Sequence, residues 1–362
     1  MITFLFFILF IPVFALVGVY AERKVSAFIQ DRYGPMEVGY KGTLQTAADI
    51  LKLLLKEDIV PSASDRKLFL MAPIIVFTAI FAGFAVIPLT SSSQNALLEA
   101  GIYYVLAIIS LDVLGILMAG WGSNNKFAMY GAMRSVAQLV SYEIPLGLSV
   151  LCVTVFCQTL NLQEISFQQG IYYSLMNSES NSNFLGIPGL DTSAIGGLLS
   201  WNIFRMPLLI PVFIIFFIAS LAECNRAPFD LPESESELVG GYHTEYSGFR
   251  WAMLMLSEYG MMLLVSLLAA ILFLGSWNTP FPNIGPVRLA DWTSGEPGTL
   301  FGHVSSAFWL ISKASILIFF QMSVRWTYPR LRVDQLMSLA WKYLIPATLV
   351  LLFLIATWKL VY

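Results

Sequence analysis

The stretch LAECNRAPFDLPESESELVGGYHTEYSGFRWAMLMLSEYG, residues 221–260, breaks a hydrophobic run with an acidic loop and then resumes it. It contains seven of the 23 acidic residues of the chain: Glu223, Asp230, Glu233, Glu235, Glu237, Glu245 and Glu258. Its arginines are Arg226 and Arg250. Apolar helices are expected on both sides, so several of these carboxylates should lie at or near a membrane surface. A carboxylate at bilayer depth costs a few kcal/mol and by default marks a functional site. For Glu235 and Glu237 a solvated acidic loop is an equally good interpretation.

The composition indicates a membrane protein. Hydrophobic residues make up 57% and charged residues 12% of the 362 residues, whereas soluble domains carry roughly 25% charged residues. The formal net charge of −3 argues against nucleic-acid binding. Cys152, Cys157 and Cys224 form no CxxC pair, and the two histidines give no zinc cluster and no paired-histidine haem motif. Because no glycine-rich nucleotide loop is found either, we expect no redox centre in this chain.

Eight apolar segments are long enough to cross a membrane. A helix needs about 20 residues to cross roughly 30 Å of hydrocarbon. The expected segments are 1–21, 68–89, 100–121, 136–158, 203–222, 251–275, 304–324 and 341–361. The first does not read as a signal peptide, because it lacks a basic start and its apolar run is too long. The predicted fold is all-α: one integral membrane domain over residues 1–362 with about eight transmembrane helices.

The lysines and arginines predict the orientation of these helices. Sixteen of the twenty fall in the first, third, fifth and seventh loops. They are Arg23, Lys24, Arg32, Lys41, Lys52, Lys56, Arg66, Lys67, Lys126, Arg134, Arg226, Arg250, Arg325, Arg330, Arg332 and Lys342. Arg205, Arg288 and Lys359 fall on the other side, and Lys313 lies inside a segment. The positive-inside rule therefore places both termini outside and the acidic loop inside.

The first inside loop contains an amphipathic segment, TLQTAADILKLLLKED, residues 43–58. Its leucines and alanines recur at helical spacing, while Lys52 and Lys56 lie away from that face. At about 13 to 16 residues the segment is too short to span, so we expect a helix lying in the membrane interface. Asp49 falls near the apolar face, and a carboxylate at the rim of the helix is as good an interpretation as a functional one.

Four carboxylates are expected within the apolar segments or at their ends. Glu223 and Glu258 are flanked by FFIASLA and MLMLS, which favours a functional role. Glu143 lies one to two turns inside the fourth segment, and Pro145 weakens the helix beside it. A proton-relay carboxylate is the favoured interpretation of Glu143, with a lone satisfied glutamate as the alternative. Asp112 also lies within a segment, and the sequence assigns it no partner.

Three motifs carry a resemblance to a known family. They are AERKVSAFIQDRYGP (residues 21–35), GWGSNNKFAMYGAMRSVAQLVSYEIP (residues 120–145) and the acidic stretch 221–259. In this order and on one side of the membrane, they resemble the H subunit of NADH:quinone oxidoreductase, respiratory complex I. The outer segment 159–202 is longer than is usual in that family. Membrane subunits of energy-converting nickel–iron hydrogenases share a looser version of the pattern.

The resemblance implies a membrane subunit that forms much of a quinone-binding chamber and couples quinone reduction to proton translocation. Inward loops 22–67 and 223–250 would form the quinone-side surface. The residues implied for the chamber are Glu22, Arg23, Arg32, Asp49, Arg226, Asp230, Glu233, Glu235 and Glu237. Those implied for a proton path are Glu143, Glu223 and Glu258. The implied partners are other complex I subunits, which would hold FMN and iron–sulfur clusters, and the implied location is the bacterial inner membrane.

Two interpretations of other classes remain at this point. A proton-coupled transporter would also need intramembrane carboxylates, but matched halves with broken helices are expected there, and the sequence shows no internal repeat. A structural anchor would explain the spans but not seven acidic residues in one inward loop and the following helix. The favoured hypothesis is that the acidic residues respond to the change in charge that quinone reduction causes. Carboxylates close together in a poorly solvated chamber cannot all stay ionised, so each proton moved shifts the pKa of its neighbours.

Overall fold

A computed structural model describes residues 2–91, 99–171, 184–186, 195–231, 238–284 and 287–361. Glu233, Glu235 and Glu237 of the acidic loop lie outside these residues. The long helices are α1 (Ile2–Ile29), α3 (Arg66–Gly83), α4 (Gly101–Gly122), α5 (Lys126–Cys157), α9 (Leu209–Glu223), α11 (Gly248–Phe273), α13 (Leu300–Thr327) and α15 (Ile345–Val361). Each contains one of the eight predicted segments or most of it, so the all-α membrane fold is confirmed.

Shorter elements join these helices. The short helices are α2 (Gln45–Leu55), α6 (Leu162–Gln168), α8 (Asn202–Arg205), α12 (Leu289–Ser294) and α14 (Val333–Ser338). A π-helical turn, Leu339–Leu344, joins α14 to α15. Single 3-10 turns cover Tyr40–Gly42, Phe84–Val86, Phe184–Gly186, Gly197–Ser200 and Gly241–His243. The strands β1 (Asn283–Ile284) and β2 (Val287–Arg288) form a two-residue antiparallel ladder.

Among the residues that the structure describes, seven helical segments are long and apolar enough to span a membrane, and α9 is a shorter apolar helix. The predicted segment 203–222 starts too early, because α8 ends at Arg205 and Met206 is extended before Pro207. Proline disfavours helical geometry in the residue before it. The 15 residues of α9 therefore cover only about 22 Å.

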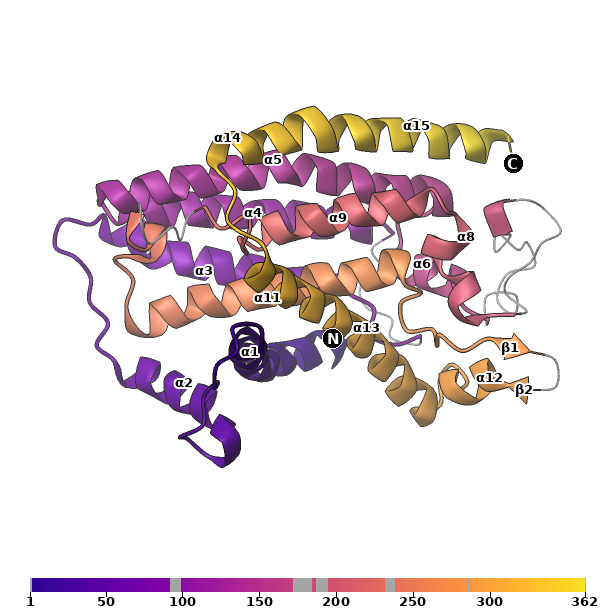
Figure 1. The fold of residues 1–362 in the computed structure, drawn as a ribbon, viewed down its shortest axis with the longest axis horizontal. Coiled ribbons are helices and arrows are strands. Elements are labelled where there is room, and N and C mark those ends of the chain that lie inside the picture. Colours follow the sequence, from indigo (N-terminus) through magenta and orange to yellow (C-terminus); the bar gives the residue numbers. More distant parts are fainter. Residues whose placement is uncertain are drawn as a thin grey trace.

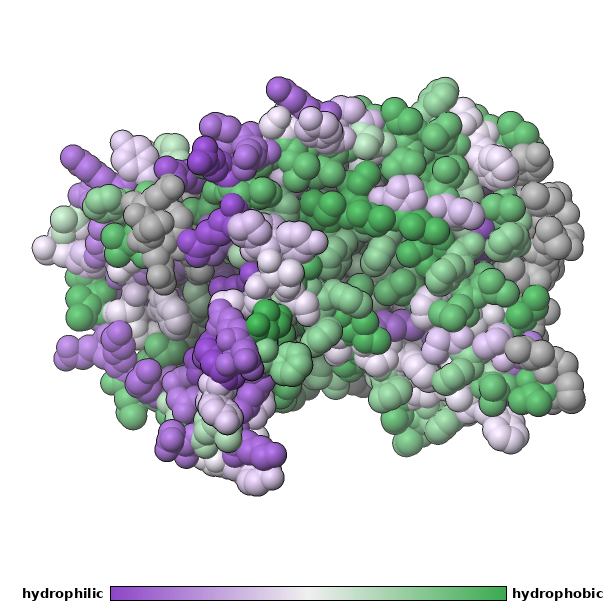
Figure 2. All heavy atoms as spheres, in the orientation of Figure 1, coloured by the Kyte–Doolittle hydropathy of each residue, from purple (hydrophilic) through white to green (hydrophobic). Residues whose placement is uncertain are grey.

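The core of the molecule is α11. Every residue from Tyr259 to Phe273 is buried, because α11 packs against α1, α3, α9 and α13. Figure 1 shows α3, α4, α5, α9, α11 and α15 lying side by side along the long axis, with α1 and α13 crossing at an angle. A band of apolar side chains covers the middle of the face in Figure 2, while hydrophilic residues gather at the end that holds α2 and α14. An apolar band of this kind is the surface that a bilayer covers.

The basic loops meet at one end of the bundle, which we call the basic end. There the backbone N–H of Asp65 donates to Gly122 O (3.0 Å), and that of Leu331 donates to Pro228 O (3.1 Å). Asn125 Nδ2 donates to Glu245 Oε1 (2.6 Å). Loops far apart in sequence are therefore held together at the end where most lysines and arginines lie.

Buried side-chain hydrogen bonds hold the opposite end together. The Gln169 side chain accepts from the backbone N–H groups of Asn202 (3.1 Å) and Gly275 (3.0 Å). The buried Lys313 donates to the carbonyls of Ser276 (2.8 Å) and Asn278 (2.6 Å), just past the end of α11. Lys313 thus joins α13 to the loop that follows α11.

The predicted amphipathic helix is present as α2 and packs against α1 and α11. Leu51, Leu54 and Leu55 remain exposed on it. Asp49 forms an ion pair with Arg23 at 2.6 Å. The helix thus presents apolar side chains outward beside the basic end, as expected for a helix at a membrane interface.

Close helix packing at α4 generates a stability prediction. A Cβ on Gly120 would lie 2.2 Å from the Cβ of Ala132 on α5, whereas one on Gly147 would meet nothing within 4 Å. We expect Gly120→Ala to lower the free energy of unfolding by about 1–3 kcal/mol through overpacking, and Gly147→Ala to leave it unchanged or raise it by up to about 1 kcal/mol, because alanine favours a helix more than glycine does. Thermal unfolding of the detergent-solubilised protein measures both, and equal midpoints would contradict the packing of α4 on α5.

Candidate functional site

A buried ion cluster lies between α1, α11, α13 and the loop after α9. Its centre is Glu22, which is 5% exposed. Both carboxylate oxygens of Glu22 lie 3.1 Å from Nη1 of Arg226, and the hydroxyl of Tyr259 donates to Oε2 at 2.5 Å. Arg325 on α13 donates to Oε1. One carboxylate therefore joins four segments that are far apart in the sequence.

The local fold of the LAECNR segment positions Arg226. Helix α9 ends at Glu223, and Asn225 adopts a left-handed conformation with φ of 48°. The N–H of Arg226 donates to Leu221 O, and the N–H of Asn225 donates to Ala222 O, both at 3.2 Å. This pair of bonds is the Schellman motif, and asparagine tolerates its left-handed position better than most residues. The turn fixes Glu223 on the helix and Arg226 just beyond it.

Helix α5 holds the same turn from the other side. Gln138 is fully buried, and its Nε2 donates to the carbonyls of Ala222 and Phe229, both at 2.7 Å. Ser135 donates to the side chain of Asn225 at 3.3 Å. The start of the acidic loop is therefore ordered by side chains of the SVAQLVSYE segment.

Arg226 keeps its charge in this setting. Burial disfavours the charged form, but Glu22 and then Tyr259 stabilise it, so the pKa of Arg226 lies well above its ordinary value. The guanidinium also lies 4.5 Å from the centre of the Tyr259 ring, an arrangement that stabilises cations. The cluster therefore contains a buried cation, Arg226, paired with the buried carboxylate of Glu22.

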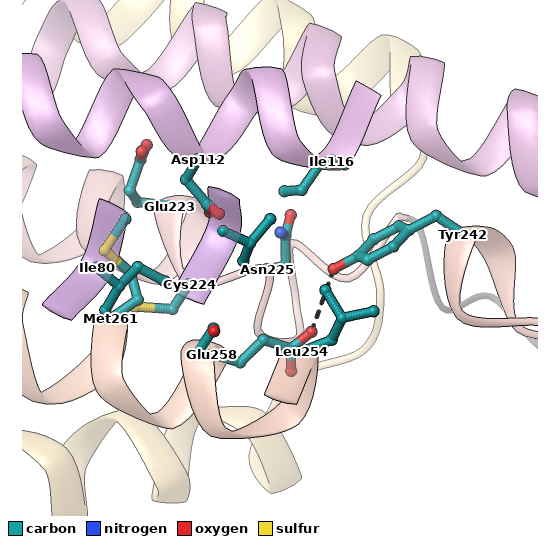
Figure 3. Close-up of a pocket in the computed structure, with 12 residues that line it drawn as sticks. Ile80, Asp112, Ile116, Glu223, Cys224, Asn225, Tyr242, Leu254, Glu258 and Met261 are labelled. Carbon is teal, nitrogen blue, oxygen red and sulfur yellow. Dashed lines mark hydrogen bonds between the residues drawn. The ribbon is translucent and has the colours of Figure 1, made fainter. Parts of the chain in front are cut away.

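Beside the cluster is a small cavity with carboxylates in its walls. Asp112, Glu223 and Glu258 all line it (Figure 3). Glu258 accepts from the hydroxyl of Tyr242 at 3.3 Å and lies 3.2 Å from Nε2 of His243. Asp112 Oδ1 and Glu223 Oε2 have no hydrogen-bond partner within the part of the chain that the structure describes.

Four carboxylates form a sequence of neighbours across the bundle: Asp112 and Glu223 are buried, and Glu143 and Glu258 are half-buried. The charge of Glu258 acts on Asp112, that of Asp112 acts on Glu223, and that of Glu143 acts on Glu223. Glu143 on α5 accepts a hydrogen bond from Ser110 on α4. Glu258 in turn is close enough to Arg226 and Arg325 to interact with both. The ion cluster and the carboxylates are thus one electrostatic system.

The remaining predicted residues are spread around the basic end. Arg23 pairs with Asp49, and Arg32 is exposed and donates to Gln30 at 2.7 Å. Asp230 is buried and pairs with Arg330 at 3.1 Å. Glu233, Glu235 and Glu237 lie outside the described residues. The structure therefore brings together Glu22 and Arg226, two residues that the resemblance implied for the chamber from loops far apart in the sequence.

Several residues of the site were not predicted. Arg325 and Arg330 were counted only as basic residues of an inside loop, and Tyr259 and His243 were not singled out. Glu22 and Arg325 are 303 residues apart, so no local pattern indicates their pairing. Within the described ranges, no group of three histidine, cysteine or acidic side chains is arranged to hold a metal ion. The ion cluster and the carboxylates beside it can hold charge and exchange protons.

Similarity to known proteins extends over nearly the whole chain. The family model described as NADH dehydrogenase matches residues 2–356. The chain is 56% identical over 360 residues to the second H subunit of the NADH-quinone oxidoreductase of Cytophaga hutchinsonii, covering 99% of this chain and 98% of that protein. It is 50% identical to the NADH-quinone oxidoreductase H subunit of Chlorobaculum parvum (97% and 90% covered) and 44% identical to that of Geobacillus sp. (95% and 89%). The matched region includes the ion cluster and the cavity.

The burial of Glu22 generates a second prediction. Glu22→Gln leaves two arginines without their carboxylate, and breaking a buried ion pair from one side costs about 3–5 kcal/mol. Asp49→Asn breaks a partly exposed pair, for which we expect about 1 kcal/mol or less. Thermal stability of the two purified variants, compared with the unsubstituted chain, measures the difference. Equal losses would mean that Glu22 does not hold the basic end together.

Proposed function

The chain belongs to the NADH dehydrogenase family, and on that premise we propose that it is the H subunit of a proton-pumping NADH:quinone oxidoreductase, respiratory complex I. It has no separate reaction of its own in this proposal, but acts as a membrane component of the oxidoreductase and translocase. The relatives at 44–56% identity are all named as the H subunit of that enzyme. A hydrogenase-type complex or a one-chain transporter is not favoured by them.

We propose that loops 22–67 and 223–250 form the quinone-side surface of the single membrane domain. The observation that carries this is the buried bond between Glu22 and Arg226, because it joins the two loops where they enter the bundle. The chamber residues would be Glu22, Arg23, Arg32, Asp49, Arg226, Asp230, Glu233, Glu235 and Glu237. The exposed leucines of α2 give the isoprenoid tail of a quinone an apolar surface at the membrane interface.

Quinone reduction consumes two protons and changes the charge in this region. We infer that Glu258 responds first, because Arg226 and Arg325 of the ion cluster act on it. The change would pass to Glu223 and then to Glu143, since the charge of Glu143 acts on Glu223 and like charges in a poorly solvated region cannot all stay ionised. Proton release toward the rest of the membrane arm would start at Glu143, which faces α4 through Ser110.

The proposed setting supplies the electron chemistry from outside this chain. FMN and iron–sulfur clusters would lie in partner subunits, and quinone is the substrate that this chain helps to enclose. The partners would be the quinone-site peripheral subunits and the small membrane-arm subunits. The location would be a bacterial inner membrane, with both termini on the periplasmic side.

The orientation generates a prediction of labelling. The new thiol of Lys56→Cys should react only with reagents that reach the cytoplasm, and that of Arg288→Cys only with reagents added outside, because the two positions are exposed at opposite ends of the bundle. Cys152, Cys157 and Cys224 are buried, so the native chain is a suitable unlabelled control. The reverse labelling pattern in oriented membrane vesicles would overturn the orientation.

The proton path generates a fourth prediction. Glu143→Gln keeps the shape and the Ser110 contact but removes the titrating group, so proton pumping should fall at least about tenfold in an assembled complex. Glu296→Gln, an exposed glutamate at the opposite end of the bundle, is the matched control and should leave pumping unchanged. Quinone reduction and pumping are measured on the same reconstituted sample, with assembly and flavin and iron–sulfur absorbance checked beforehand. Normal pumping in an assembled Glu143→Gln complex would remove Glu143 from the path.

A further inference from the structure

Asp112 on α4 is a buried carboxylate that the proposed path leaves unused. It is 6% exposed, and no hydrogen-bond partner of its Oδ1 is found among the residues described. Figure 3 shows its side chain pointing from α4 into the space between α4 and α11, with Glu258 across the cavity on α11. Glu223, whose Oε2 also lacks a partner in the described ranges, lies beside it at the end of α9. The cavity volume of about 10 Å³ leaves room for about one water molecule.

A purely structural role does not explain this arrangement. Burying a polar group without a hydrogen bond costs roughly 1–3 kcal/mol in proteins, and an unpaired charge costs much more. The buried carboxylate of Asp230 offsets that cost by pairing with Arg330. Asp112 instead has an oxygen free to bind a water or a proton.

The charges around Asp112 define what it can bind. The titratable groups that line the cavity with it are Glu223, Cys224, Tyr242 and Glu258. The arginines that act on Glu258, Arg226 and Arg325, lie on its side of the cavity, where His243 also contacts the Glu258 carboxylate. A negative charge is therefore best stabilised on Glu258, while Asp112 and Glu223, as neighbouring carboxylates, repel each other when both are ionised. A proton between them removes that repulsion, and the metal-ligand geometry that a cation would need is not found in the described part of the chain.

We propose that Asp112 is a proton-binding residue that connects Glu258 to Glu223 through a water in this cavity. Protonated Asp112 gives its proton to the Glu223 carboxylate, which becomes neutral while Asp112 becomes the anion. Asp112 is then reprotonated from the carboxylic acid form of Glu258, through the water, and Glu258 returns to its ionised form beside the arginines. Each step moves one proton and one negative charge in opposite directions. The proposal rests on the proton path of the proposed function and adds to it a step that the path otherwise lacks.

The test compares Asp112→Asn, Asp112→Glu and Ile116→Val in the assembled, reconstituted complex. Ile116 lies one turn further along α4 and lines the same cavity without a titratable group, so Ile116→Val is the matched control. The readouts are protons pumped per quinone reduced and the carboxylic-acid bands of the redox-difference infrared spectrum. Asp112→Asn should remove one such band and lower pumping at least twofold. Asp112→Glu should restore most of the pumping and move the band, and Ile116→Val should match the unsubstituted complex.

Three results would overturn the proposal. The first is an Asp112→Asn complex with all bands and normal pumping. The second is an Asp112→Glu complex whose bands are unchanged, which is decisive even where Asp112→Asn fails to assemble. The third is an equal loss of pumping in all three variant complexes, which would indicate packing alone.

Glu223→Gln in the same series separates this inference from the proposed path. If Glu223→Gln loses pumping while Asp112→Asn keeps it, the path stands and only the role of Asp112 fails. If both keep normal pumping, the carboxylate path itself fails.

Discussion

The cost of burying charge constrains the basic end of the molecule. Removing an ion from water costs several kcal/mol even after the protein relaxes, unless a well-placed partner compensates. Glu22 and Arg226 are both buried, so each depends on the other and on Tyr259 and Arg325. The first helix, the turn after α9, the central helix and α13 therefore have to meet at one point.

The two ends of the bundle are stabilised in different ways. At the end opposite the basic end, the side-chain amides of Gln169 and Asn202 donate hydrogen bonds to backbone carbonyls, and Lys313 donates to a backbone carbonyl as well. At the basic end, arginines and carboxylates hold the segments together, and their interactions change when one of these carboxylates binds a proton. Electrostatic response is thus concentrated where the quinone-side surface is proposed.

The sequence was sufficient to locate the helices and it singled out Glu143, Glu223 and Glu258, but it did not indicate the partners of these carboxylates. Hydropathy located all eight segments because an apolar run of about twenty residues is characteristic of a membrane-spanning helix. The start of the fifth was misplaced, since Pro207 interrupts an otherwise apolar run. Glu143, Glu223 and Glu258 stand out because charges are rare in such segments, whereas nothing in the local sequence connects Glu22 to Arg325. Contacts between helices that are distant along the chain follow no sequence period, so Arg325 was indistinguishable from any other loop arginine.

Without Glu258, the ion cluster carries two positive charges and one negative charge. Two guanidinium groups face one Glu22 carboxylate, and Glu258, which interacts with both arginines, supplies the second negative charge. Counting these four groups alone, the cluster is electrically neutral while Glu258 is ionised and carries one excess positive charge once Glu258 binds a proton. At an effective dielectric constant near 20, one such charge changes the energy of another about 10 Å away by about 1.7 kcal/mol. That changes a protonation equilibrium more than tenfold. A single proton can therefore alter the electric potential over much of the basic end without the movement of any helix.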